Sequence, residues 1–309
     1  MPDFVCPIDH GPLTASAEQL VCGRCGTAFP VSGGIPILLN EANSVFRASD
    51  YTSQAAYGGA SDYGGSADSA RGWRAMYHRF AQKLANPDAP LKFFTVPQAL
   101  AHIRTEIAHP EVLVIGAGEV DYQGGDFTYT DVAFGKHVAC ICDAHDLPFA
   151  DNSFDMIIAT AVLEHVADPA RCVTEFVRTL RPGGFVYAMT PFLQPVHMRA
   201  HDFTRFTYLG HRRLFRHFDD IQSGIFAGPA TVLATVMRYA LLGMVRGRRL
   251  TAAMRLLGLL LSWPARYVDV LLSRRAAAYD AAFAVYFFGR KREAPIADRD
   301  ILAFYRGGG

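Results

Sequence analysis

Apolar residues occur along the chain in short runs bounded by glycine, proline and acidic residues, a pattern typical of buried β-strands. Between the fourth and fifth runs, residues 169–180 show the wider spacing of apolar positions that predicts an amphipathic helix. Strands that alternate with helices predict a mainly parallel sheet with helices on both faces. We therefore expect an α/β fold with a doubly wound, mostly parallel seven-stranded sheet, its strands at residues 112–116, 127–131, 138–142, 154–161, 184–190, 220–225 and 282–289.

Composition divides the chain before this sheet into two further regions. Residues 1–40 hold short strand-like pieces separated by cysteine, glycine and proline, and they predict a small separate module. Residues 41–70 are rich in glycine, serine, alanine and tyrosine without periodicity, which predicts a flexible linker. The sheet domain then occupies residues 71–309, and it begins with helical patterns at 71–85 and 96–107.

A glycine-containing turn and two acidic residues follow the first three predicted strands. Gly116 and Gly118 come after the first strand, where the lack of a Cβ lets the backbone approach a ligand. Asp131 ends the second strand, where a carboxylate can hold ribose hydroxyls. The stretch D-A-H-D-L-P-F at 143–149 follows the third strand and offers an apolar slot with one acceptor, which suits an aromatic base.

The ordered motifs V-L-V-I-G-A-G-E-V, D-A-H-D-L-P-F, L-E-H-V-A-D-P and L-R-P-G-G-F resemble those of class I S-adenosylmethionine-dependent methyltransferases of the broad small-molecule type, which have a Rossmann-like fold. The resemblance spans about residues 110–225 and the last strand. It implies S-adenosyl-L-methionine as cofactor, bound by Gly116, Gly118, Asp131, Asp143, Ala144, Leu147, Ala161 and His165. In this arrangement Asp131 would contact the ribose and Asp143 the adenine amino group. The alternative is that Asp143 is a loop carboxylate, Leu147 a core residue and His165 a structural side chain.

One interval departs from the family pattern and keeps a second function open. Only 14 residues, Ala117–Thr130, separate Gly116 from Asp131, so the first helix of the family would shrink to about a turn. The leading expectation is a methyltransferase that O-methylates a sugar, a glycolipid or a secondary-metabolite hydroxyl. The alternative is a non-catalytic binding or scaffold protein with a degenerate cofactor site.

A polar loop, T-P-F-L-Q-P-V-H-M-R-A-H-D-F-T-R-F-T, follows the fifth predicted strand. His197 is the candidate catalytic base, because an imidazole can accept the proton of an acceptor hydroxyl near neutral pH. His201, Asp202 and Arg205 are candidate substrate-binding residues. Asp202 and Arg205 have a second interpretation, because their i,i+3 spacing also favours an ion pair with each other. The loop resembles a segment of relatives that modify sugars, glycolipids or natural products.

Cysteines at the start of the chain predict a metal site. Cys22 and Cys25 are separated by two residues, and Cys6 begins a similar knuckle. The stretch resembles the zinc-ribbon-like module of small methyltransferase-activating subunits, in which a cysteine stands where this chain has Asp9. The resemblance implies a structural Zn²⁺ bound by the three thiolates and completed by Asp9 or by the neighbouring His10. The alternative is a ribbon that folds on its small core alone.

Charge distribution sets one region apart from the rest. The chain has a net charge of only +1, which argues against nucleic acid as a partner. Residues 226–281 form a predicted helical, cationic insertion, and 229–275 hold eight arginines against one acidic residue, Asp269. The insertion suits an interfacial helix pair on anionic lipid, or a lid or homodimer contact. Without a signal-peptide pattern we expect a cytoplasmic protein, peripheral at the inner membrane surface if its acceptor is a glycan linked to lipid rather than a small molecule.

Overall fold

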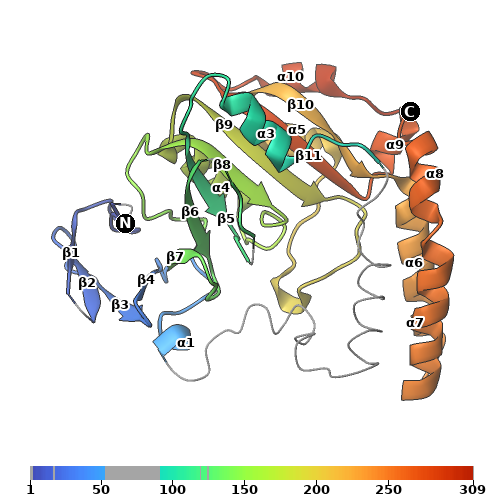
Figure 1. The fold of residues 1–309 in the computed structure, drawn as a ribbon, viewed down its shortest axis with the longest axis horizontal. Coiled ribbons are helices and arrows are strands. Elements are labelled where there is room, and N and C mark those ends of the chain that lie inside the picture. The colour runs from blue at the N-terminus through green and yellow to red at the C-terminus, as the bar shows by residue number, and fades with distance from the viewer. Residues whose placement is uncertain (1–2, 17, 53–90, 119, 124, 309) are drawn as a thin grey trace.

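A computed structural model describes residues 3–16, 18–52, 91–118, 120–123 and 125–308. The predicted helix at 71–85 and residues 53–70 of the predicted linker lie outside this part of the chain. Figure 1 shows a central sheet with the small N-terminal module at one end and a group of long helices at the other.

The described strands form one mixed sheet of 11 strands in the order β1-β2-β3-β4-β7-β6-β5-β8-β9-β11-β10. The neighbours from β4 to β9 in this order pair in parallel, and the remaining pairs are antiparallel. The α/β class is confirmed, whereas the prediction of a mostly parallel seven-stranded sheet is wrong in strand number and in strand direction. The strands are β1 (Leu13–Ala15), β2 (Gln19–Cys22), β3 (Ala28–Ser32), β4 (Ile35–Leu38), β5 (Glu111–Ile115), β6 (Asp126–Asp131), β7 (Val138–Cys142), β8 (Phe154–Thr160), β9 (Leu180–Pro191), β10 (Phe218–Ala227) and β11 (Ala284–Lys291).

The larger strand number arises because the N-terminal module joins the central sheet. Its last strand, β4, pairs in parallel with β7, and Leu38 lies opposite Cys142. Ile37 and Leu38 are fully buried, as expected for a strand of a parallel sheet that is covered on both faces. The short antiparallel strands β1, β2 and β3 then continue the sheet outward from β4.

Helices cover both faces of the central strands. On one face α4 and α5 pack over alternate strand residues such as Leu113 and Ile157, and on the other α3 packs over Val112 and Ile158. The period-2 alternation of these buried residues is what allows one strand to contribute to two cores. The helices are α1 (Ser49–Thr52), α3 (Val96–Ile103), α4 (Pro169–Thr179), α5 (Tyr208–Leu214), α6 (Pro229–Gly243), α7 (Arg248–Ser262), α8 (Ala265–Leu272), α9 (Ala277–Asp280) and α10 (Asp298–Ile301), with 3₁₀ turns η3 (Arg199–His201) and η4 (Leu302–Phe304).

The helices α6, α7 and α8 form the predicted insertion and extend past the end of the sheet (Figure 1). The start of α6 is bound by Asp269 of α8, a side chain with no solvent exposure. The Asp269 carboxylate accepts hydrogen bonds from the backbone N–H groups of Gly228, Ala230 and Thr231 and from the Thr231 hydroxyl, at 2.6–3.0 Å. Among the described helices, none combines the length and the apolar character that crossing a membrane requires.

Residues 41–52, predicted as the beginning of a flexible linker, instead pack against the carboxyl ends of the strands. The Ser44 hydroxyl donates a hydrogen bond of 2.7 Å to Asp143 Oδ2. The Tyr51 hydroxyl donates one of 2.6 Å to the carbonyl of Val132. This segment therefore lies over the edge of the sheet at which the sequence predicts the ligand.

Candidate active site and metal-binding clusters

The predicted glycine turn follows β5, and its geometry requires glycine. Gly116 has φ +63° and Gly118 has φ +55°, a region of backbone conformation that favours glycine. A Cβ on Gly116 would lie 2.4 Å from Val162 Cγ2, so the loop after β8 approaches this backbone closely. Between β5 and β6 the described residues contain no helix, and a hydrogen bond from Val120 N to the carbonyl of Ala117 closes a single turn, in agreement with the expected shortening.

Asp131 lies at the end of β6, next to the glycine turn. Its carboxylate accepts hydrogen bonds from the backbone N–H of Gly118 at 2.8 Å and of Ala133 at 3.0 Å. Burial raises the pKa of Asp131, and these hydrogen bonds oppose the effect. An acidic side chain held beside a glycine turn fits the predicted contact with ribose hydroxyls.

Asp143, in the predicted adenine corner after β7, is hydrogen-bonded to other residues of the protein. The carboxylate of Asp143 accepts hydrogen bonds from Ser44 Oγ at 2.7 Å, from His145 N at 3.1 Å and from His145 Nδ1 at 2.5 Å. Burial raises the pKa of Asp143, but the hydrogen bonds from His145 and Ser44 outweigh it, and the pKa lies below its ordinary value. The predicted adenine acceptor thus already accepts three hydrogen bonds within the protein, and adenine would compete with the Ser44 hydroxyl for it.

The two predicted wall residues of the adenine pocket are buried. Leu147 has no exposed surface and Ala144 is 4% exposed, and both belong to the core under α4. The structure agrees here with the alternative of a loop carboxylate and a core leucine. The cofactor contacts of the glycine turn, Asp131 and the adenine corner stay predictions.

The loop after β8 brings three polar side chains together. Glu164 is fully buried, and neither of its carboxylate oxygens accepts a hydrogen bond from any described residue. His165 Nε2 lies 3.7 Å and His197 Nε2 lies 3.6 Å from Glu164 Oε1. The two Nε2 atoms are 3.1 Å apart. The sequence identifies the two histidines, but it does not assign a role to Glu164, although the motif L-E-H-V contains it.

The candidate substrate-binding residues organise the loop after β9. Asp202 and Arg205 form a bidentate ion pair, as their spacing allows, and Asp202 Oδ2 also accepts a hydrogen bond from the backbone N of His197 at 2.7 Å. Burial raises the pKa of Asp202, but the Arg205 guanidinium lowers it below its ordinary value. His201 contributes its carbonyl to His165 Nδ1 at 2.7 Å and stacks on Phe46 with ring centroids 5.5 Å apart. Asp202 and Arg205 therefore hold His197 in place.

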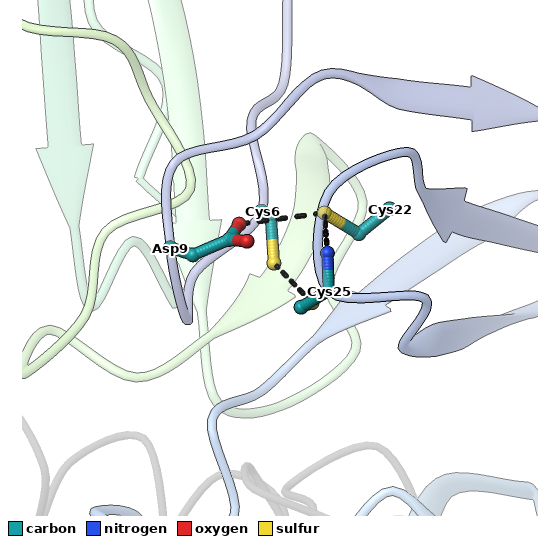
Figure 2. Close-up of side chains that lie close together, drawn as sticks. All are labelled: Cys6, Asp9, Cys22 and Cys25. Atoms are coloured by element: carbon teal, nitrogen blue, oxygen red, sulfur yellow. Dashed lines mark hydrogen bonds between the residues drawn. The ribbon is translucent and has the colours of Figure 1, made fainter.

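The N-terminal cysteines converge with one carboxylate (Figure 2). Cys6 Sγ lies 3.7 Å from Cys25 Sγ, and Cys22 Sγ lies 3.3 Å from Asp9 Oδ1. All four ligand atoms lie within 4.8 Å of one another, a group to which His10 does not belong. Three thiolates and one carboxylate at these separations fit a tetrahedral Zn²⁺, whose bonds to sulfur are about 2.3 Å long. The structure thus brings Asp9, and not His10, to the fourth ligand position.

Two protein-family models match separate segments of the chain. Residues 121–188 match the family model described as a methyltransferase domain, and residues 4–34 match the model of Trm112p-like proteins. These matches confirm the sequence prediction of a methyltransferase domain that follows a module similar to methyltransferase activators. The first match includes Asp131, Asp143 and the cluster residues Glu164 and His165, and it ends before His197.

Individual relatives share shorter stretches. An uncharacterized methyltransferase of Mycolicibacterium vanbaalenii is 44% identical over 68 residues, 22% of this chain and 26% of the relative. A ubiquinone/menaquinone biosynthesis C-methyltransferase of Desulfotalea psychrophila is 43% identical over 44 residues, 14% of this chain and 18% of the relative. The chain therefore spans about a quarter or less of the length of these curated relatives.

Among solved structures, the complex between the Haloferax volcanii Trm112 methyltransferase activator and a methyltransferase has 18% sequence identity. The structural alignment covers 72% of this chain and 98% of the matched chain in the complex, with a TM-score of 0.41.

Proposed function

We propose that the protein is an S-adenosylmethionine-dependent methyltransferase that transfers the methyl group to a hydroxyl of a sugar, a glycolipid or a secondary metabolite. The observation that carries the proposal is the glycine turn with Asp131 at the carboxyl end of β5 and β6, within a sheet whose β8 end presents a buried polar cluster. The methyltransferase-domain match over residues 121–188 supports the same class of reaction.

S-adenosylmethionine supplies a methyl group on a sulfonium when it is bound. The acceptor oxygen would use a lone pair to form a bond to the methyl carbon, while the electron pair of the broken C–S bond returns to sulfur. The chain contributes mainly by positioning and by excluding water. Gly116, Gly118 and Asp131 would hold the methionine and ribose portions, and Ala161 and His165 would border the methyl group.

Loss of the acceptor proton would occur at the loop after β9. His197 is the candidate base, and its side chain is partly exposed while its neighbour Glu164 is not. Asp202 lies 3.3 Å from His197 Nδ1 and accepts a hydrogen bond from the His197 backbone, which would position the residue. A hydroxyl acceptor requires such a group because its proton must leave as the new bond forms.

The N-terminal module would act within the same chain as a fixed activator-like subunit. Cys6, Asp9, Cys22 and Cys25 would hold a structural Zn²⁺, and β4 would transmit the position of the module to β7. Ser44, in the segment that follows β4, reaches Asp143 at the adenine corner. The segment that directly follows the module in the chain would therefore contact the cofactor site.

The helical insertion keeps its two predicted roles. Its exposed apolar side chains include Leu233 of α6 and Leu271 of α8, and its arginines include Arg238 of α6 and Arg255 of α7. Such a surface suits contact with anionic lipid, and it also suits contact with a second copy of the chain. Sedimentation with anionic and neutral vesicles, together with the molar mass in solution, distinguishes the two roles.

The experiment that tests the function is calorimetric titration with S-adenosylhomocysteine. We expect binding by the wild type and a loss of about 10- to 100-fold in affinity for Asp131→Ala, because a hydrogen bond to a charged group contributes about 1.5–3 kcal/mol. Asp126→Ala is the matched control, since Asp126 is an exposed residue of the same strand. Absence of binding at millimolar ligand would contradict the proposal and favour the scaffold function.

A further inference from the structure

The cluster after β8 contains more hydrogen-bond acceptors than donors. His165 Nδ1 lies 2.7 Å from the carbonyl of His201, which can only accept, so Nδ1 carries the proton and Nε2 presents a lone pair. His197 Nδ1 lies 3.3 Å from Asp202 Oδ2 without the geometry of a hydrogen bond, and the nearby negative charge favours a proton on Nδ1 of His197 too. Both Nε2 atoms then direct lone pairs toward each other and toward Glu164 Oε1.

Burial makes this arrangement costly unless a cation completes it. Glu164 has no exposed surface, and within the described part of the chain both of its carboxylate oxygens lack a hydrogen-bond donor. A buried ionised group without a partner destabilises the folded state by on the order of several kcal/mol, because nothing compensates its desolvation. A cation between the three converging atoms removes this cost, and protonation of one of the three groups is the other way to remove it.

The backbone that carries these side chains is strained on both sides. Ala161 has φ +55°, and Met198 and Arg199, directly after His197, have φ +59° and +53°. Residues other than glycine rarely adopt this conformation, and such strain gathers at ligand-binding sites. The two loops are also joined, because Phe203 N donates a hydrogen bond of 2.8 Å to the carbonyl of Glu164. The fold thus holds the three side chains at fixed separations.

We propose that Glu164, His165 and His197 bind a divalent transition-metal cation through Glu164 Oε1 and the Nε2 atoms of the two histidines. At metal–ligand bonds of about 2.0–2.2 Å, donors 3.1–3.7 Å apart subtend angles of about 90–135° at the metal. Two imidazoles and one carboxylate form a ligand set of catalytic zinc and non-haem iron sites, and they leave at least one coordination position open.

The contacts behind the two histidines match those of metal ligands. The second ring nitrogen of a ligating histidine usually contacts a carbonyl or a carboxylate, which fixes the tautomer and the ring orientation. His165 has the carbonyl of His201 in this position, and His197 has the carboxylate of Asp202. Arg205 in turn holds Asp202.

The inferred cation changes the role of His197, and this part of the inference rests on the proposed methyltransferase function. With its Nε2 lone pair bound to the cation, His197 would not itself accept the proton. An acceptor hydroxyl at the open position would instead become more acidic by coordination and release its proton to water. A lone pair of the acceptor oxygen would then be available for the bond to the methyl carbon.

Equilibrium dialysis of the full chain against Co²⁺, followed by metal analysis and absorption spectroscopy, tests the site. We expect Glu164→Gln and His197→Ala each to bind about one equivalent of Co²⁺ less than the wild type, because each removes one ligand of a three-ligand site. Glu164→Gln preserves the shape of the side chain, and His109→Ala, at an exposed histidine, is the matched control. Absorption due to thiolate bound to Co²⁺, which reports the cysteine cluster, should remain unchanged.

Equal Co²⁺ content in the wild type and both ligand variants would overturn the inference. So would a loss of Co²⁺ that is accompanied by a matching loss of thiolate absorption, because the cation would then belong to the cysteine cluster. Titration of the same samples with S-adenosylhomocysteine separates the two proposals. Cofactor binding without the second metal contradicts only the metal site, and the second metal without cofactor binding contradicts only the methyltransferase function.

Discussion

Two buried carboxylates, Glu164 after β8 and Asp269 in α8, differ sharply in their hydrogen bonding. Both are fully inaccessible to solvent. Asp269 accepts four hydrogen bonds, three of them from backbone N–H groups at the start of α6. The carboxylate oxygens of Glu164 accept none from the described residues and face two imidazole nitrogens instead.

This difference separates a structural charge from a functional one. A carboxylate at a helix N-terminus satisfies backbone donors that would otherwise be buried without partners, and it interacts favourably with the helix dipole. Asp269 therefore stabilises the fold as it stands. Glu164 has no such donors in the described chain, and the cation that we infer would compensate its burial, as expected for a group that the protein keeps for its function.

The largest effect should follow Asp269→Ala. The substitution leaves three backbone donors without acceptors, one of them buried and two partly buried, so we expect a loss of about 3–5 kcal/mol in the free energy of unfolding of the insertion. Hydrogen exchange of the α6 amides measures the loss, with Asp300→Ala as an exposed aspartate control. Unchanged α6 protection would show that Asp269 is not the structural charge of this comparison.

Glu164→Gln should change stability in the opposite direction. In the presence of a chelator, we expect the free energy of unfolding of the variant to be about 1–3 kcal/mol higher than that of the wild type. The reason is that the substitution removes a buried charge that has no hydrogen-bond donor. Denaturant unfolding with chelator, and again with added Co²⁺, measures this difference. Added Co²⁺ should stabilise the wild type more than the variant. If the variant is less stable than the wild type in chelator, Glu164 stabilises the fold, as Asp269 does.

His211 of α5 offers a third buried polar group, far from any predicted ligand. Its side chain lies against Phe215 and Phe287, and its Nε2 lacks a hydrogen-bond partner in the described structure. Burial, together with the charge of Arg212, lowers the pKa of His211 to about 3. The unfolded chain takes up this proton below about pH 6.5, so the folded state loses about 1.4 kcal/mol per pH unit below that value.

Between pH 7 and pH 5 this single group should therefore reduce the free energy of unfolding by about 2 kcal/mol. His211→Phe keeps the aromatic packing and removes the titration, so the variant should lose about 2 kcal/mol less than the wild type over the same range. Urea unfolding at several pH values measures the two slopes, with His109→Phe as the exposed control. Parallel slopes for wild type and His211→Phe would contradict the assignment.

The smallest effect concerns Ser44, which satisfies Asp143 from the segment after β4. Ser44→Ala removes one hydrogen bond to a carboxylate, of about 1.5 kcal/mol. If adenine uses Asp143, the variant should bind S-adenosylhomocysteine about tenfold more tightly, because the ligand no longer competes with the hydroxyl. Calorimetry measures the change, with Ser49→Ala as the control. Unchanged affinity would mean that adenine does not contact Asp143.

The sequence predicted most of the central sheet. The strand predicted at 138–142 is β7, and the runs at 112–116 and 154–161 correspond to β5 and β8 within one residue. These segments are buried on both faces, so their apolar runs are continuous and easy to recognise. The fifth strand was predicted too short, because Leu180–Gly183, which contains the turn-forming residues Pro182 and Gly183, extends β9 at its beginning.

The sequence did not predict that the N-terminal module continues the sheet. The pairing of β4 with β7 joins residues about 100 positions apart, and only the three-dimensional arrangement brings them together. The run I-P-I-L-L at residues 35–39 was the available signal, because an apolar run of this kind is typical of an interior parallel strand. The same pairing places Ser44 over Asp143, a contact with no local pattern.

What the sequence determined by itself is local: the strands and helices, the glycine turn after β5, the knuckle of Cys22 and Cys25, and the spacing that pairs Asp202 with Arg205. Periodicity and residue spacing encode these features within a few positions. The tertiary structure decided which side chains meet. It selected Asp9 over His10 and brought His197 to Glu164 and His165, because loops from different strands converge only after the sheet has fixed their ends.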